Sequence, residues 1–269
     1  MFLIMKITTH KYTMSKVNTE LVDEGLFEAA CQKFVHRVQG ANGIGTLSEK
    51  TVHAVLKYYY CPDEAHHEVK IGDYVADACI DGEIYEIQSK AFHLLRGKLT
   101  EFLKEYDVTV IYPVAITKFL RYVDPDTGEI TSPKKSSKKG SIYDVVPELY
   151  GIKGFLNNPR LHIVICFIEM EEYKLLDGYG KDRKHHATKT DRIPTKIIGE
   201  FRIEEVDDYL RLLPEGLPER FTNKDISLLS GYHVSYCQML TNVLSSVGLI
   251  DKVGKVGNAL LYEIGHAGR

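Results

Sequence analysis

The sequence lacks an excess of positive charge, a long hydrophobic run and a cysteine framework. The formal net charge of its 269 residues is −3, so any surface that attracts nucleic acid has to be local. No segment approaches about 18 uninterrupted apolar residues, and the opening MFLIMK is too short a run for a signal peptide or a membrane span. We therefore expect a soluble protein with no membrane segment.

Cysteine usage argues against two further classes of protein. The five cysteines are far apart and include no Cys-x-x-Cys pair, so neither a disulfide framework nor a structural zinc site is expected. This pattern is typical of a reducing cytoplasm. The length and a hydrophobic content of 44% fit one large globular domain or two smaller ones.

The most informative stretch is DYVADACIDGEIYEIQSK, residues 73–90. Asp81-Gly82 is a two-residue turn of the kind that closes a β-hairpin. Counting outward from this turn places Asp77 opposite Glu86, and it also pairs Val75 with Gln88 and Asp73 with Lys90.

Directly opposed carboxylates, with Cβ atoms roughly 5 Å apart, repel one another. A divalent cation between Asp77 and Glu86 would remove this repulsion, since hard oxygen ligands suit Mg²⁺. A pair of solvated acids on an exposed sheet face explains the same residues, and the charges alone leave both interpretations open.

An Asp on one strand, a hairpin and a Glu-x-Lys on the next strand resembles the PD-(D/E)XK nuclease superfamily, which has a restriction-endonuclease-like fold. The matching positions are Asp77 and Glu86-Ile87-Gln88, with Gln88 where that superfamily usually has Lys. The resemblance implies Mg²⁺ (or Mn²⁺) held by Asp77 and Glu86, a water-positioning role at Gln88 and, one repeat further along the strand, at Lys90. The chain also resembles a group of uncharacterised bacterial proteins that share the Glu-Ile-Gln core.

A helix is predicted before this hairpin, from the capping box Thr46-Leu-Ser-Glu49 to about Tyr60. Its apolar positions predict burial of Val52, Val55, Leu56 and Tyr59. The superfamily places an acidic residue on this helix, and Glu49 is the candidate. Reciprocal capping of Thr46 explains Glu49 equally well, and both roles stay open.

The segments after the hairpin predict an α/β architecture. The spacing of Phe92, Leu95 and Leu99 indicates an amphipathic helix over residues 91–104, with Lys98 on an outer face. Residues 108–114 and 161–168 are continuous apolar runs, typical of strands covered on both sides. We expect a mixed β-sheet flanked by helices, the restriction-endonuclease-like core, with a further helix over residues 142–156.

Two lysine-rich segments are candidate phosphate contacts. The run SPKKSSKKGS contains Lys134, Lys135, Lys138 and Lys139 and no acid. A polar segment around residues 180–194 carries five Lys and Arg residues and is predicted to be a second loop. Solvated, flexible loops account for both segments without a nucleic acid.

The C-terminal part, residues 214–269, resembles a winged helix-turn-helix domain. A short helix from Phe221, a turn at Gly231 and a second helix over residues 234–247 precede a predicted hairpin. The resemblance makes the second helix a recognition helix. The residues it would present to DNA are Ser235, Tyr236, Gln238, Met239 and Asn242, with Lys252 and Lys255 on the wing.

We therefore predict three regions: an N-terminal helical arm (1–40), a nuclease-like domain (41–213) and a winged-helix domain (214–269). The arm is open to interpretation as a packing element or as a dimer contact. The predicted function is a Mg²⁺-dependent DNA endonuclease. Two alternatives remain open: an inactive nuclease-fold protein that binds DNA through its winged helix, and an assembly protein that contacts no nucleic acid.

Overall fold

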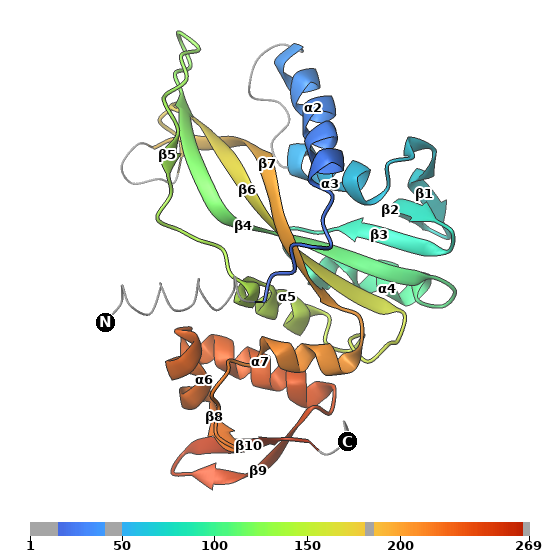
Figure 1. Ribbon diagram of the computed structural model, residues 1–269, viewed down its shortest axis with the longest axis vertical. Coiled ribbons are helices and arrows are strands. Elements are labelled where there is room, and N and C mark those ends of the chain that lie inside the picture. Colours follow the sequence, from blue (N-terminus) through green and yellow to red (C-terminus); the bar gives the residue numbers. More distant parts are fainter. Residues whose placement is uncertain (1–15, 41–49, 181–185, 266–269) are drawn as a thin grey trace.

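The protein is an α/β protein with a mixed, open β-sheet flanked by helices (Figure 1). The computed structural model describes residues 16–40, 50–180 and 186–265. In this part of the chain the main sheet has the order β1-β2-β3-β4-β6-β7, and β5 pairs with β4 beside this path. Its strands are β1 (His67–Ile71), β2 (Tyr74–Ile80), β3 (Glu83–Ile87), β4 (Asp107–Val123), β5 (Lys134–Lys135), β6 (Leu161–Leu175) and β7 (Thr188–Ile203).

Helices cover both faces of this sheet. The α-helices are α2 (Glu24–Gly40), α3 (Lys50–Tyr60), α4 (Arg96–Phe102) and α5 (Val146–Gly151). The short 3-10 helices are η1 (Glu64–His66), η2 (Phe92–Leu95), η3 (Ile142–Val145) and η4 (Val206–Leu212). The chain then forms β8 (Arg220–Thr222), α6 (Asn223–Ser230), α7 (Val234–Ser246), β9 (Ile250–Val256) and β10 (Ala259–Ile264), with the three strands in the order β8-β10-β9.

The β2–β3 hairpin turns at Asp81 and Gly82, which have φ values of 51° and 86°. Both central residues of this tight turn require positive φ, which Asp tolerates and Gly adopts freely. The ladder pairs Ile80 with Glu83 and Ala78 with Tyr85. These pairs confirm the predicted register from the turn to the end of the ladder at Tyr85.

The outer part of the predicted ladder is wrong. The β2–β3 ladder ends at the pair of Ala78 and Tyr85, β2 begins one residue after Asp73, and β3 ends at Ile87. The backbone N–H of Gln88 instead donates to Ile111 of β4 at 2.9 Å. The β3 backbone therefore leaves the β2 ladder after Tyr85 and continues along β4, so Asp73 and Lys90 are not ladder partners.

The strand directions make the sheet mixed. β3 pairs with β4 in parallel across η2 and α4, β4 pairs with β6 in parallel across η3 and α5, and β6 pairs with β7 antiparallel. Side chains alternate along β4, so Val110 and Tyr112 face α4 and α5, while Ile111 faces the opposite side. Both faces are apolar, as the continuous hydrophobic runs predicted.

The face that contains Ile111 is covered by α2 and α3. Val52, Val55, Leu56 and Tyr59 of α3 are all buried there, which confirms the prediction from helical spacing. Phe27 of α2 packs edge-on against Tyr59, with ring centroids 5.5 Å apart. The described part of the N-terminal arm is thus a packing element of this face.

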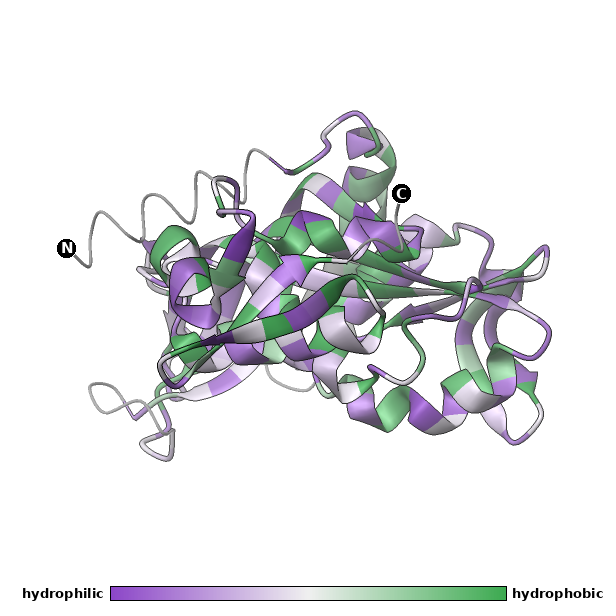
Figure 2. Cartoon of the chain, turned by 90° about the horizontal axis from the view of Figure 1, so that it is seen from below, coloured by the Kyte–Doolittle hydropathy of each residue, from purple (hydrophilic) through white to green (hydrophobic). Residues whose placement is uncertain are grey.

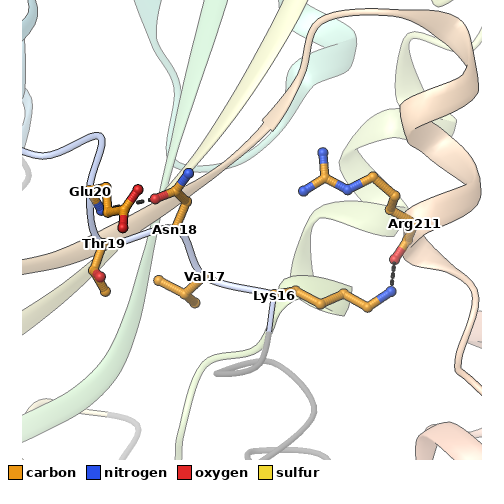
Figure 3. Close-up of a pocket in the computed structure, with 6 residues that line it drawn as sticks. All are labelled: Lys16, Val17, Asn18, Thr19, Glu20 and Arg211. Carbon is orange, nitrogen blue, oxygen red and sulfur yellow. Dashed lines mark hydrogen bonds between the residues drawn. The ribbon is translucent and has the colours of Figure 1, made fainter.

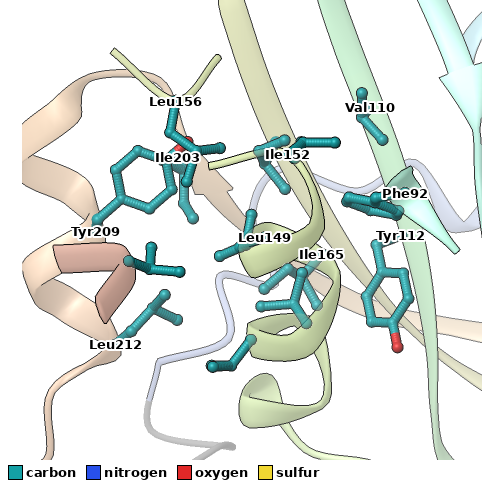
Figure 4. Close-up of a cluster of buried hydrophobic side chains, with 14 of the residues drawn as sticks. Phe92, Val110, Tyr112, Leu149, Ile152, Leu156, Ile165, Ile203, Tyr209 and Leu212 are labelled. Carbon is teal, nitrogen blue, oxygen red and sulfur yellow. The ribbon is translucent and has the colours of Figure 1, made fainter. Parts of the chain in front are cut away.

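The other face is covered by α4, α5 and η4 and by the C-terminal elements. Leu149 of α5 and Tyr209 of η4 lie in the layer beneath the strands (Figure 4). The same hydrophobic cluster continues into Leu240 and Val243 of α7. Residues 214–265 therefore extend the core of the main sheet.

Three segments differ from the sequence predictions. Thr188–Pro194, predicted as loop, belongs to β7, since β6 and β7 pair out to Leu175 and Thr188. Lys134 and Lys135 pair with Leu120 and Phe119. The helix predicted over residues 142–156 is divided into η3 and α5 and ends at Gly151. In each β segment the long edge of β4 or β6 supplies hydrogen-bond partners that local composition does not reveal.

Hydrophobic residues follow the central strands, and hydrophilic residues gather on the outer loops and helix faces (Figure 2). No helix in the described ranges is both long and apolar enough to cross a membrane.

Candidate functional site

Asp77 and Glu86 lie side by side on β2 and β3, and each carboxylate is bonded to the backbone of the other strand. The Asp77 Oδ2 atom accepts from the N–H of Ile87 at 2.8 Å, and the Glu86 Oε1 atom accepts from the N–H of Asp77 at 3.3 Å. Glu86 is buried and the Asp77 side chain is 15% exposed. Solvation therefore does not explain the pair, in contrast to the surface interpretation that the sequence left open.

Lys98 of α4 closes the site from the helical side. Its Nζ atom donates to both oxygens of Glu86, at 2.9 and 2.8 Å. The sequence prediction placed Lys98 on an outer face of one helix over residues 91–104 and was wrong, since this segment is divided into η2 and α4 and the Lys98 side chain reaches Glu86 of β3. The sequence signal that could have found Lys98 is its position as a cation on α4, the first α-helix after the strand that carries Glu86.

His53 of α3 approaches from the opposite face of the sheet, and its Nε2 atom lies 2.9 Å from Asp77 Oδ2. On the helix predicted from Thr46 to about Tyr60, His53 lies one turn after Glu49, and this position alone favours a surface or core histidine over a catalytic one. Its role in the structure is to hold Asp77, together with the Ile87 N–H, in one orientation.

The pKa values of the two acids are shifted in opposite directions. Burial, followed by the neighbouring Asp77 carboxylate, raises the pKa of Glu86 to about 7, against the opposing effect of Lys98. Burial works to raise the pKa of Asp77, but the hydrogen bond and charge of His53, the Ile87 N–H and the charge of Lys98 together hold this pKa below its ordinary value. Two adjacent carboxyl groups whose pKa values are shifted apart in this way are typical of sites that transfer a proton or bind a cation.

Of the three remaining predicted site residues, two line a cleft and one lies outside the described residues. Gln88 directs its amide to the carbonyl oxygen of Lys90 at 2.7 Å, and both residues line the cleft described below. The described hydrogen bond of the Gln88 side chain is thus to Lys90 and not to Asp77 or Glu86. Glu49 lies outside the described residues.

A cleft of about 1630 Å³ opens beside the carboxylate pair. His53, Ile87 and Gln88 form the part of its wall nearest the pair. The opposite part is formed by the C-terminal residues Tyr232, His233 and Tyr236. The cleft is larger than the about 300–1,000 Å³ usual for a small-molecule site, so it has room for a polymeric ligand.

The cleft wall is basic, unlike the chain as a whole. Its cationic residues are Lys57, Lys90, Lys118, Lys138, Lys139 and Arg192, and its acidic residues are Glu68 and Asp144. Lys57 is paired with Glu68, and the other cations outnumber the acids. This is the local positive surface that the net charge of −3 did not reveal.

The lysines predicted to contact nucleic acid lie at three separate places. Lys138 and Lys139 line the cleft, whereas Lys134 and Lys135 are exposed on β5. Lys252 and Lys255 are exposed on β9.

On α7, Tyr236 faces the cleft and Ser235 and Gln238 are exposed. Asn242 instead accepts a hydrogen bond from Lys153 at 2.8 Å, because α7 packs against the α5 side of the core.

A second hollow, of about 490 Å³, lies where the N-terminal segment crosses β7 (Figure 3). Asn18 pairs through its backbone with Glu200, and Lys16 donates to the carbonyl oxygen of Arg211. Gly199 permits this close approach, since a Cβ there would lie 2.6 Å from the Asn18 oxygen. These contacts attach the N-terminal segment to β7 and η4, so the hollow is explained by the packing of this segment.

The carboxylate pair fits a hard divalent cation in its chemistry, since both groups offer oxygen donors. Both Glu86 oxygens are engaged by Lys98, so the ammonium group has to move before Glu86 can bind an ion. Within the described ranges no group of three or more His, Cys, Asp and Glu side chains is arranged around a common metal position. An ion would therefore depend on water or a phosphate for its other ligands.

These features define an α/β protein with a carboxylate pair, one member of which is held by Lys98, beside a basic cleft. Residues 50–204 match the family described as a domain of unknown function, DUF8091, and the chain belongs to that family. The matched region contains His53, Asp77, Glu86 and Lys98.

An uncharacterized protein of Treponema pallidum (strain Nichols) is 27% identical over 222 residues, which is 82% of this chain and 87% of the relative. No solved structure matches the chain.

Proposed function

We propose that this protein is a metal-dependent deoxyribonuclease that hydrolyses phosphodiester bonds in the basic cleft. The observation that carries the proposal is the convergence of Asp77, Glu86 and Lys98 from two paired strands and the next helix. A nuclease needs oxygen ligands for a cation, a positive charge near the scissile phosphate and a channel that attracts a polyanion. The described residues supply all three.

The residues have distinct roles in this proposal. Asp77 and Glu86 would hold Mg²⁺ or Mn²⁺, and the ion would supply polarisation of the phosphate and a lowered pKa of the attacking water. Lys98, released from Glu86, offsets the negative charge that develops on the phosphate. Gln88 can hydrogen-bond a water but supplies no charge, so Lys98 takes the part that the superfamily pattern gives to the lysine two residues after Glu86. His53 keeps Asp77 oriented.

The arrangement of elements supports a restriction-endonuclease-like core as part of the proposal. A helix, α3, precedes the hairpin that carries the two acids, and a parallel crossover through α4 leads to the buried strand β4. The elements α6, α7, β9 and β10 follow the order of a winged helix-turn-helix. We assign the protein to the reducing cytoplasm because all five cysteines are free.

A second candidate function is DNA binding without cleavage. It is favoured by one observation: Lys98 engages both oxygens of Glu86, which is a satisfied arrangement of a buried acid without any metal ion. In this case the carboxylate pair stabilises the fold, and the cleft retains its attraction for phosphates.

A cleavage assay separates the two functions. Purified protein is incubated with Mg²⁺ or Mn²⁺ and single-stranded, duplex and branched DNA. The nuclease proposal predicts cleavage that disappears in Asp77→Asn and in Glu86→Gln, and falls at least tenfold in Lys98→Met. The matched control is Lys104→Met, because Lys104 pairs with Glu101 on the protein surface at 2.6 Å. Absence of turnover by the wild-type protein on every substrate supports the binding function instead.

A further inference from the structure

A group of cations surrounds one buried carboxylate at the far end of the cleft. Glu172 of β6 has a side chain that is 4% exposed, and its Oε2 atom lies 3.2 Å from Lys118, 3.2 Å from Lys189 and 3.5 Å from Arg192. Lys174 lies 4.0 Å from its other oxygen. We call Glu172, Lys118, Lys189 and Arg192 the Glu172 cluster. It contains three cations and one anion.

The cations of this cluster are held close together by the sheet. Arg192 of β7 pairs in register with Glu172, Lys118 of β4 pairs with Met170, and Lys189 pairs with Lys174, so the three cations reach Glu172 from its own level and from the levels two residues before and after it. Burial, followed by the nearby Arg192, lowers the pKa of Lys189. A single carboxylate leaves part of this positive charge uncompensated, and Lys118 and Arg192 both line the cleft. The cluster is thus suited to a second anion, such as a phosphate of a polymer.

Aromatic rings lie at the C-terminal end of the same cleft. Tyr236 is 36% exposed, and its ring centroid is 5.5 Å from that of Tyr232, with the planes tilted by 58°. The Tyr232 hydroxyl donates to Asp144 Oδ1 at 3.3 Å. Tyr232 is therefore fixed from behind, and Tyr236 presents a ring on which an unpaired base can stack.

The cleft connects these two ends across a gap in the sheet. β3 pairs with β4 only as far as Ile111, and β5 pairs with β4 again only from Phe119. The intervening residues Tyr112, Pro113, Val114 and Ala115 line the cleft. A flexible single strand can follow a channel that passes over a strand edge, whereas a stiff duplex has to be bent there at an energetic cost.

We propose that the cleft binds single-stranded DNA, with a backbone phosphate at the Glu172 cluster and a base stacked on Tyr236. This inference rests on the proposed function and specifies its substrate class. It combines the two features by which proteins bind single strands, a basic groove and aromatic stacking positions.

The test measures binding by fluorescence anisotropy in EDTA, so that cleavage plays no part. The probes are a labelled thymidine oligonucleotide of about 20 nucleotides, the same strand with abasic positions, and the corresponding duplex with its complement. The variants are Lys118→Gln/Arg192→Gln and Tyr236→Ala. Their matched controls are Lys104→Gln/Lys224→Gln, at exposed lysines outside the cleft, and Tyr179→Ala, at a tyrosine that is 90% exposed. Circular dichroism melting checks that each variant is folded.

The expected result is at least tenfold tighter binding of the single strand than of the duplex. The double variant should weaken binding to both intact and abasic strands and reduce the slope of log affinity against log salt by about 1. Tyr236→Ala should weaken binding of the intact strand about tenfold and leave the abasic strand nearly unaffected. The inference is overturned if the duplex binds as tightly as the single strand, or if Tyr236→Ala behaves like Tyr179→Ala.

The outcomes of this binding test can be distinguished from the outcomes of the cleavage assay. Duplex cleavage without a preference for single strands would preserve the nuclease proposal and remove this inference. Strong single-strand binding without cleavage would preserve this inference and favour the non-catalytic function.

Discussion

Replacing Lys98 by methionine should make the stability of the protein strongly dependent on pH. Lys98 is the cation that faces both oxygens of Glu86, a carboxylate whose side chain is 3% exposed. Methionine keeps much of the apolar stem and removes the charge. A buried ion pair that loses one partner leaves an uncompensated charge, which is far more costly than losing a surface pair.

The size of the effect follows from protonation of Glu86. Its pKa of about 7 lies above the ordinary value of 4.5, so wild-type stability already falls as the pH rises through this interval. Without Lys98 this pKa rises further, and the loss continues above pH 7.

At about pH 5.5 Glu86 is protonated in both proteins, and the variant should lose only a little stability. About pH 8.5 is about 1.5 units above the pKa of Glu86 in the wild type, where this carboxyl group is therefore ionised. In the variant, the raised pKa of Glu86 costs about 1.4 kcal/mol of stability for each of these units, an additional loss of about 2 kcal/mol.

Urea unfolding followed by circular dichroism at these two pH values measures the difference. Lys104→Met is the control, since its surface pair with Glu101 is worth at most about 1 kcal/mol and should show no comparable pH dependence. The double variant Lys98→Met/Glu86→Gln should recover most of the loss at high pH. An equal loss for Lys98→Met at both pH values, or no recovery in the double variant, would refute this account of the site.

Three further predictions concern the fold and are measured by urea unfolding. Leu149→Ala should cost about 2–5 kcal/mol and lower the midpoint of one common transition, because Leu149 belongs to a cluster that includes both the main sheet and α7; two separate transitions would contradict this. Gly82→Ala should cost about 1 kcal/mol or more through its φ of 86°, whereas Gly154→Ala, which likewise meets no neighbouring atom but has no positive φ, should be neutral or stabilising. Thr222→Ala should cost about 0.5–2 kcal/mol, because Thr222 caps α6 in a capping box with Asp225, and an unchanged midpoint would count against that cap.

Local chemistry predicted the carboxylate pair. The Asp81-Gly82 turn fixes the hairpin register, and period-two alternation then brings Asp77 and Glu86 together. The α/β class and the buried face of α3 followed from hydrophobic periodicity in the same way. These features depend on residues that are close in the sequence.

The partners of the pair depend on tertiary structure and were not predicted. Lys98 reaches Glu86 because Ala91 adopts a left-handed conformation and η2 sets the orientation of α4. The Glu172 cluster requires the register of three long strands. The packing of α7 onto α5, which ties Asn242 to Lys153, is likewise set by complementary surfaces distant in sequence.

A titration with Mn²⁺ tests the central claim most directly, namely that Asp77 and Glu86 act together as a divalent-cation site. Electron paramagnetic resonance of free Mn²⁺ gives the bound fraction for the wild type, Asp77→Asn, Glu86→Gln and the surface control Glu101→Gln. We predict binding by the wild type and by Glu101→Gln, and a loss of at least tenfold in affinity in each of the other two variants. Equal Mn²⁺ affinity in all four proteins would contradict the claim.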